Sequence, residues 1–182
     1  NLELSKYVAF HEFTHMLDAE MYTYGDKMRY MGLSGFTEYH ASQIELLQLL
    51  GASSVDKVKS FSMSTVINAI SGQKCVSQYL AEKQEHSISL FCRADFPANI
   101  NTLKSAFGVL FNYFGLRSIC EMYATNYKET ICNEAFLKIV PSMQFIPLNR
   151  LMHNWLDTEQ IDMSITLYAV IVMALIKEYK LI

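Results

Sequence analysis

The 182-residue chain can form one domain with a sizeable core, or a core with one helical extension. Hydrophobic residues make up 51% of it and charged residues 18%, a balance that excludes intrinsic disorder. So high an apolar fraction suggests helices buried on several sides, or a surface covered by a partner or a further segment. The net charge is −3 with no cluster of Lys and Arg, which argues against direct binding of nucleic acid, because phosphate contacts need clustered cations.

Seven Gly and three Pro are few for this length, and they favour a mainly α-helical chain. The four cysteines form no C-x-x-C pair, and we expect reduced core thiols in a cytoplasmic protein. Because residues 1–6 resemble neither a leader nor a translation start, we expect a fragment or the ordered part of a longer protein.

Taken in chain order, the pattern predicts a first helix over residues 2–21, then a connection marked by Gly25 and by the run from Gly32 to Gly35. Thr37 is expected to cap a second helix over 37–50, which Gly51 ends. No strand pair is expected. Further helices are predicted over 54–70, 74–94, 99–125, 129–139, 147–156 and 160–180, the last three separated by Pro141 and Pro147.

Residues 165–176 are almost wholly apolar, but twelve residues are too few for a bilayer that needs about twenty. We expect a core helix whose residues Val170, Met173, Ala174 and Ile176 pack on several sides, and no membrane span.

The segment with the clearest chemistry is His11-Glu12-Phe13-Thr14-His15, an H-E-x-x-H motif on the first predicted helix. Residues four apart are rotated by about 400° and rise about 6 Å, so both imidazoles project from one face and can bind one metal ion. Imidazole nitrogens at about 2.0–2.1 Å suit Zn²⁺. Glu12, about 100° round the helix from His11, can reach a metal-bound water and act as general base.

The residues flanking the two histidines are uncharged and mostly bulky, which predicts an interior helix. Buried imidazoles need partners, and a metal ion provides one for both. The simpler alternative is two hydrogen-bonded core histidines with Glu12 at the surface.

A catalytic zinc site needs a third protein ligand, and we expect it to be Glu38, in the first turn of the second helix. The small residues Ala41 and Ser42 on its face would let the two helices approach, and a connection of about fifteen residues would let them run antiparallel. His40 and Glu45 are the rival third ligands. His40 lies about 200° from Glu38, so that only one of the two can face the metal.

Two supporting roles stay open. The carboxylates of Asp18, Asp26 and Glu45 are available to accept the second N–H of a ligating imidazole. A donor that stabilises the reaction's oxyanion is harder to choose, and the candidates are Tyr22, Tyr24, Tyr30, Tyr39, His40 and His86.

H-E-x-x-H followed by Glu38-Tyr39-His40-Ala41 resembles the glutamate-type zincins, and most closely the ImmA/IrrE family of small metallopeptidases. The resemblance covers about residues 4–50. It implies zinc bound by His11, His15 and Glu38, with Glu12 activating water. The sequence departs from the family at Ser42–Glu45, where the family tends to show Asn-x-Phe-Ala, and the sheet that precedes the zinc helix in the family is absent here.

These observations predict a mainly α fold in a single domain over 1–182, with zinc-site core helices at 1–52 and a multi-helix extension at 53–182. The expected function is a zinc metalloendopeptidase acting on a peptide or protein substrate, with an oligomeric state that the sequence does not give. The alternative is a non-catalytic helical interaction module that retains a zincin scaffold.

Overall fold

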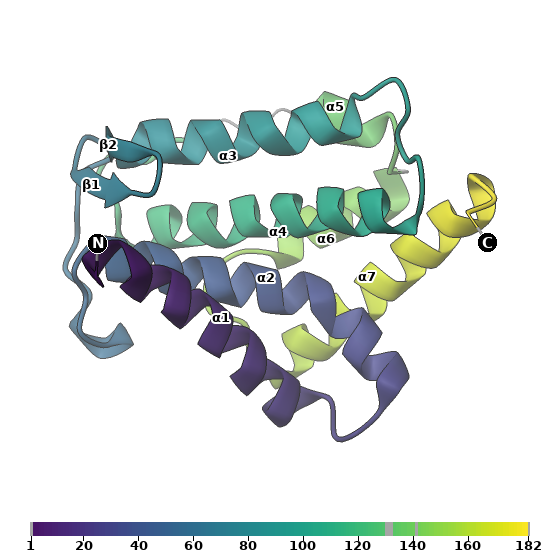
Figure 1. Cartoon of the computed structure of the whole chain (residues 1–182), viewed down its shortest axis with the longest axis horizontal. Helices are drawn as coiled ribbons and strands as arrows, with labels where there is room; N and C mark the ends of the chain where they lie inside the picture. The colour runs from purple at the N-terminus through teal and green to yellow at the C-terminus, as the bar shows by residue number, and fades with distance from the viewer. Residues whose placement is uncertain (1, 130–132, 141, 182) are drawn as a thin grey trace.

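The computed structural model describes residues 2–129, 133–140 and 142–181, and it is mainly helical, as predicted (Figure 1). Its elements are α1 (Leu2–Tyr22), α2 (Lys27–Leu49), a 3₁₀ turn (Val55–Lys57), β1 (Val66–Ala69), β2 (Gly72–Cys75), α3 (Val76–Phe91), α4 (Ile100–Tyr123), α5 (Asn133–Leu137), α6 (Ser142–Leu151) and α7 (Thr158–Glu178).

The second helix begins ten residues earlier than predicted, and its cap is Asp26 rather than Thr37. The Asp26 carboxylate accepts hydrogen bonds from the backbone N–H groups of Met28, at 2.7 Å, and Arg29, at 3.3 Å. The α1–α2 connection is therefore a tight turn of residues 23–26, not a segment of about fifteen residues. Gly51, with a φ of +77°, follows the end of the helix as predicted.

Gly32 and Gly35 lie inside α2 because neighbouring side chains need the space. A Cβ on Gly35 would come within 2.6 Å of the Tyr168 ring and 2.7 Å of the Phe111 ring, and one on Gly32 within 2.8 Å of Ile165. The glycines were predicted to mark a turn, but they are contact points for α4 and α7.

The helices stack in the order α3, α4, α2 and α1, and α7 packs on another side of α2 (Figure 1). Helix α2 is thus the central element. A continuous hydrophobic core runs from Leu33 on α2 through the phenylalanines of α4 to Ile176 on α7. The site helices and the later helices share this core.

The helix predicted over 54–70 is wrong, as is the expectation that no strands pair. Residues Val66–Ala69 and Gly72–Cys75 form an antiparallel hairpin with Val66 opposite Cys75 and Ala69 opposite Gly72. β-Branched Val66 and Ile67 favour the extended form, and Gly72, with a φ of +108°, allows the turn.

Helix α6 also differs from the prediction, since it starts at Ser142 and continues through Pro147. Pro141 lies outside the described residues.

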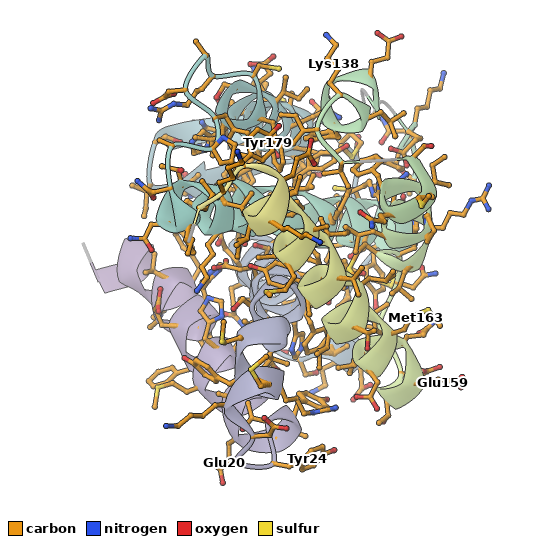
Figure 2. The ribbon with its side chains drawn as sticks, turned by 90° about the vertical axis from the view of Figure 1, so that its right-hand side faces the viewer. Glu20, Tyr24, Lys138, Glu159, Met163 and Tyr179 are labelled. Atoms are coloured by element: carbon orange, nitrogen blue, oxygen red, sulfur yellow. The ribbon has the colours of Figure 1, made fainter. Side chains whose placement is uncertain are left out.

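Helix α7 is long and apolar enough to cross a membrane by length and composition, and 44% of its apolar window is buried within this chain. Its inner face packs against α2 and α6 through Ile161, Ile165 and Tyr168, in the manner of a core helix. The expectation that it packs on several sides is wrong for Val170, Met173 and Ala174, which are exposed. Figure 2 shows Glu159 and Met163 on the outer side of this helix.

Cys75, Cys92 and Cys120 are free thiols, in agreement with the predicted reduced state, and Cys132 lies outside the described residues. Cys120 alone of these three is buried, so the expectation of core thiols is wrong for the exposed Cys92 and the half-buried Cys75.

Candidate metal centre

Helix α1 places the two motif histidines one turn apart on the face that packs against α2, with ring centroids 4.8 Å apart. Both are partly buried: the His11 side chain is 15% exposed and the His15 side chain 25%. The predicted same-face arrangement is therefore present.

Glu38 reaches the histidines from the middle of α2, not from its first turn. Its Oε2 atom lies 3.7 Å from His11 Nε2 and 3.9 Å from His15 Nε2. One ligand atom from each of the three residues falls within 4.8 Å of the others, so the group could hold a metal ion. Tetrahedral ligands with bonds of about 2.05 Å stand about 3.3 Å apart, so ligand atoms that lie up to 4.8 Å apart must approach by up to about 1.5 Å to close on an ion.

The other nitrogen of each imidazole is also occupied. His15 Nδ1 lies 2.8 Å from the Thr37 hydroxyl, and His11 Nδ1 lies 3.0 Å from Glu45 Oε2, without the alignment of a full hydrogen bond. Because both Nδ1 atoms face side chains of α2, both Nε2 atoms are left to face Glu38. Such contacts fix the tautomer and ring orientation of a ligating histidine.

The rival ligands occupy other positions. His40 Nδ1 lies 2.9 Å from Asp18 Oδ1, and its ring stacks on Phe36 at 5.6 Å. Of the two His11 nitrogens, Glu45 contacts Nδ1 and not Nε2, which is the supporting role left open for it. Asp18 is 1% exposed and serves His40 rather than a motif histidine. Asp26 is the α2 cap.

The histidine and glutamate side chains of the site shift one another's pKa values. Burial by itself lowers the pKa of His11, but the carboxylates of Glu38 and Glu45 outweigh it and raise the pKa from 6.5 to about 9. Burial raises the pKa of Glu38, and the two histidines outweigh it and hold the pKa below its ordinary value. At neutral pH and without metal, His11 is thus an imidazolium between two carboxylates, and a divalent cation would replace its positive charge.

Glu12 is exposed, and its side chain makes no hydrogen bond or ion pair with any described residue. The interior-helix prediction is wrong for this part of α1, because the helix packs on α2 along one side and leaves the other free. The exposed side carries Phe10, Phe13, Met16, Leu17 and Met21.

Two hollows adjoin the histidines. A cavity of about 530 Å³ beside His11 lies between α1, α3 and the β-hairpin, with His86 among its lining residues. A smaller hollow of about 180 Å³ is bordered by His15, Glu38 and Tyr30. Of the predicted oxyanion donors, Tyr30 and His86 therefore lie beside the site.

The remaining donor candidates point elsewhere. The Tyr39 hydroxyl donates to the carbonyl of Asn154, and Tyr22 packs against Phe36. Tyr24 projects from the α1–α2 turn near Glu20, as Figure 2 shows.

Sequence reasoning missed three polar residues at the site. Thr37 was interpreted as a helix cap. Asn112 on α4 accepts a hydrogen bond from Ser42 at 2.6 Å and hydrogen-bonds Glu38, and Tyr79 on α3 donates to Glu45. Neither Asn112 nor Tyr79 lies near the motif in sequence, and no local pattern marks them. Ser42 accordingly faces α4, not α1 as predicted.

Comparison with protein-family models, curated proteins and solved structures finds no significant match to this chain.

Proposed function

We propose that this chain is a zinc-dependent metallopeptidase of the glutamate-ligand zincin type, with His11, His15 and Glu38 as ligands and Glu12 as general base. The observation that carries the proposal is the convergence of both Nε2 atoms on Glu38 Oε2, while Thr37 and Glu45 occupy both Nδ1 atoms. Ordinary core histidines need hydrogen bonds, but they do not need to aim their free nitrogens at one carboxylate.

The donor set fits a catalytic zinc ion better than a structural one. Structural zinc prefers four protein ligands, often cysteine, whereas catalytic zinc keeps three and leaves a position open. Here two imidazoles and one carboxylate form the group, and none of the described cysteines belongs to it. When bound, Zn²⁺ lowers the pKa of a coordinated water and polarises the substrate carbonyl.

Glu12 supplies the proton transfers. Its carboxylate sits on the helical position next to His11, is open to solvent and has no competing partner among the described residues. It accepts the proton of the attacking water and delivers it to the leaving amine, so the peptide bond breaks with an acid and an amine as products. Tyr30 and His86 are the side chains placed to donate to the oxyanion.

The resemblance to the ImmA/IrrE family extends the proposal to a zincin-like core made by α1 and α2, acting on a peptide or protein in the cytoplasm. Helices α3 and α4 form the far wall of the site, and the cavity beside His11 offers room for a substrate side chain.

The test combines metal binding with cleavage. Native protein should bind one zinc ion by calorimetry and cleave members of a peptide library, while Glu12→Gln should bind zinc equally well and lose cleavage by at least about 100-fold. Glu20→Gln is the matched control, because Glu20 is an exposed glutamate of the same helix two turns further on, and it should behave as native protein.

A second candidate function is the helical interaction module, which the exposed apolar residues of α1 favour. A zinc-loaded native protein that cleaves no peptide would support that module and overturn the peptidase. Cleavage that survives Glu12→Gln would overturn the assigned mechanism.

A further inference from the structure

A chain of contacts runs from the metal centre into α3. His11 Nδ1 lies 3.0 Å from Glu45 Oε2, and the other oxygen of the same carboxylate accepts a hydrogen bond from the Tyr79 hydroxyl. Glu45 is 8% exposed and Tyr79 is 7% exposed, so both residues are largely buried, at the edge of the hollow beside His11.

Both oxygens of Glu45 are therefore engaged, one with α1 and one with α3. A carboxylate held at both oxygens cannot rotate without losing a contact, and this fixes the direction from which it meets His11. Lys83, one turn after Tyr79 on α3, lies with its Nζ 5.4 Å from the centre of the Tyr79 ring and interacts electrostatically with Glu45.

On the basis of the proposed metal site, we infer that Tyr79 is a positioning residue for it: through Glu45, it holds His11 with Nδ1 inward and Nε2 facing Glu38. Residues 1–52 contain every proposed ligand, but they do not hold the site in shape by themselves, since α3 supplies the outer anchor. The third helix thus contributes to metal affinity, although none of its side chains touches the ion.

The expected effect of Tyr79→Phe is modest and specific. The phenyl ring keeps the packing and removes one hydroxyl, so Glu45 loses one fixed contact and His11 is held less firmly. A buried hydrogen bond of this kind contributes about 1 kcal/mol, which corresponds to about a five-fold weaker zinc affinity. Loss of the contact between Glu45 and His11 Nδ1 should lower the zinc affinity roughly 10- to 100-fold.

The experiment is a double-mutant cycle on zinc affinity, measured by competition with a chelating dye on the full chain. The variants are Tyr79→Phe, Glu45→Met and the two combined. Tyr113→Phe is the matched control, because Tyr113 is also a buried tyrosine. Its hydroxyl accepts a hydrogen bond from Gln84 at 2.9 Å, away from the metal centre. Circular dichroism verifies that each variant is folded.

We expect Tyr79→Phe to weaken zinc binding about five-fold in the native background and to have no further effect once Glu45 is Met. Tyr113→Phe should bind as native protein does. Equal affinity of Tyr79→Phe and native protein, or full additivity of the two substitutions, would overturn the role of Tyr79. Both of those outcomes leave zinc binding and Glu12-dependent cleavage intact, so they are distinct from failure of the proposed function, which is native protein that binds no zinc.

Discussion

At the scale of single residues, the site depends on which nitrogen of each histidine is free. Thr37 and Glu45 take the Nδ1 atoms, and Glu38 faces the Nε2 atoms. Glu38, which would complete a metal site, and Glu45 together raise the pKa of His11, so metal and proton compete for this histidine.

This competition gives zinc binding a defined pH dependence. His11 must lose its proton to become a ligand, and its pKa is raised from 6.5 to about 9. The apparent zinc affinity should therefore rise about ten-fold per pH unit from about pH 6.5 to about pH 9 and then level off. The stability of the metal-free protein changes with pH in the opposite direction. Protonated His11 contributes fully to that stability below pH 6.5, and this contribution is lost as the pH rises through 9.

Calorimetric titrations at several pH values measure the slope. In Glu45→Gln, which lacks one raising charge, the affinity should level off at a lower pH than in native protein. A native curve that is already flat above pH 7 would contradict the assignment.

At the scale of elements, the position of Glu38 depends on how closely α4 approaches α2. A Cβ on Gly115 would lie 2.1 Å from the carbonyl oxygen of Tyr39, so this position accepts glycine alone at the present spacing. One face of α4 thus brings Gly108, Asn112 and Gly115 toward the segment 38–42 of α2.

Two glycine substitutions on α4 should act in opposite directions. Gly115→Ala forces the helix backbones apart and should lower the free energy of unfolding by about 2–3 kcal/mol. In Gly108→Ala, the new Cβ would make an ordinary contact, 3.6 Å from Glu38 Oε1. The better helix propensity of alanine should therefore raise the free energy of unfolding by about 0.5–1 kcal/mol. Denaturant unfolding measures both, and a Gly115→Ala variant as stable as Gly108→Ala would refute the close approach.

At the scale of the whole molecule, the group of His11, His15 and Glu38 that could hold a metal ion lies between an outer helix and a well-packed core. Helix α2 is enclosed by α1, α4 and α7, whereas α1 has one packed side and one apolar side open to solvent (Figure 1). The His11–His15 segment thus lies at the boundary between the core and this open face.

Replacing leucine by alanine should have different effects on stability at the open face of α1 and in the core. Leu17 on α1 is 61% exposed and Leu33 on α2 is 2% exposed. Leu17→Ala should change the free energy of unfolding by less than about 0.5 kcal/mol, while Leu33→Ala should lower it by about 2–5 kcal/mol. Thermal and urea unfolding compare the pair. A loss of similar size in Leu17→Ala would mean that the outer face of α1 is packed in solution.

Features that depend on neighbours within one helix could be predicted from the amino-acid sequence. The fold class and the long helices follow from composition and periodicity, and the pairing of His11 with His15 follows from the helical repeat. The structure also groups Glu38 with the two histidines, as expected, although Glu38 lies in the middle of α2 and not in its first turn.

The other features could not be predicted in this way, because they depend on contacts between residues far apart in the chain. Gly32 and Gly35 look like turn residues until Ile165, Phe111 and Tyr168 are seen to need their space. The short hairpin strands carry too few residues for a periodic signal. Tyr79 and Asn112 join the site because α3 and α4 pack beside it. The apolar face of α1 is open because no described element covers it. Such contacts are set by how helices pack, which local sequence patterns do not encode.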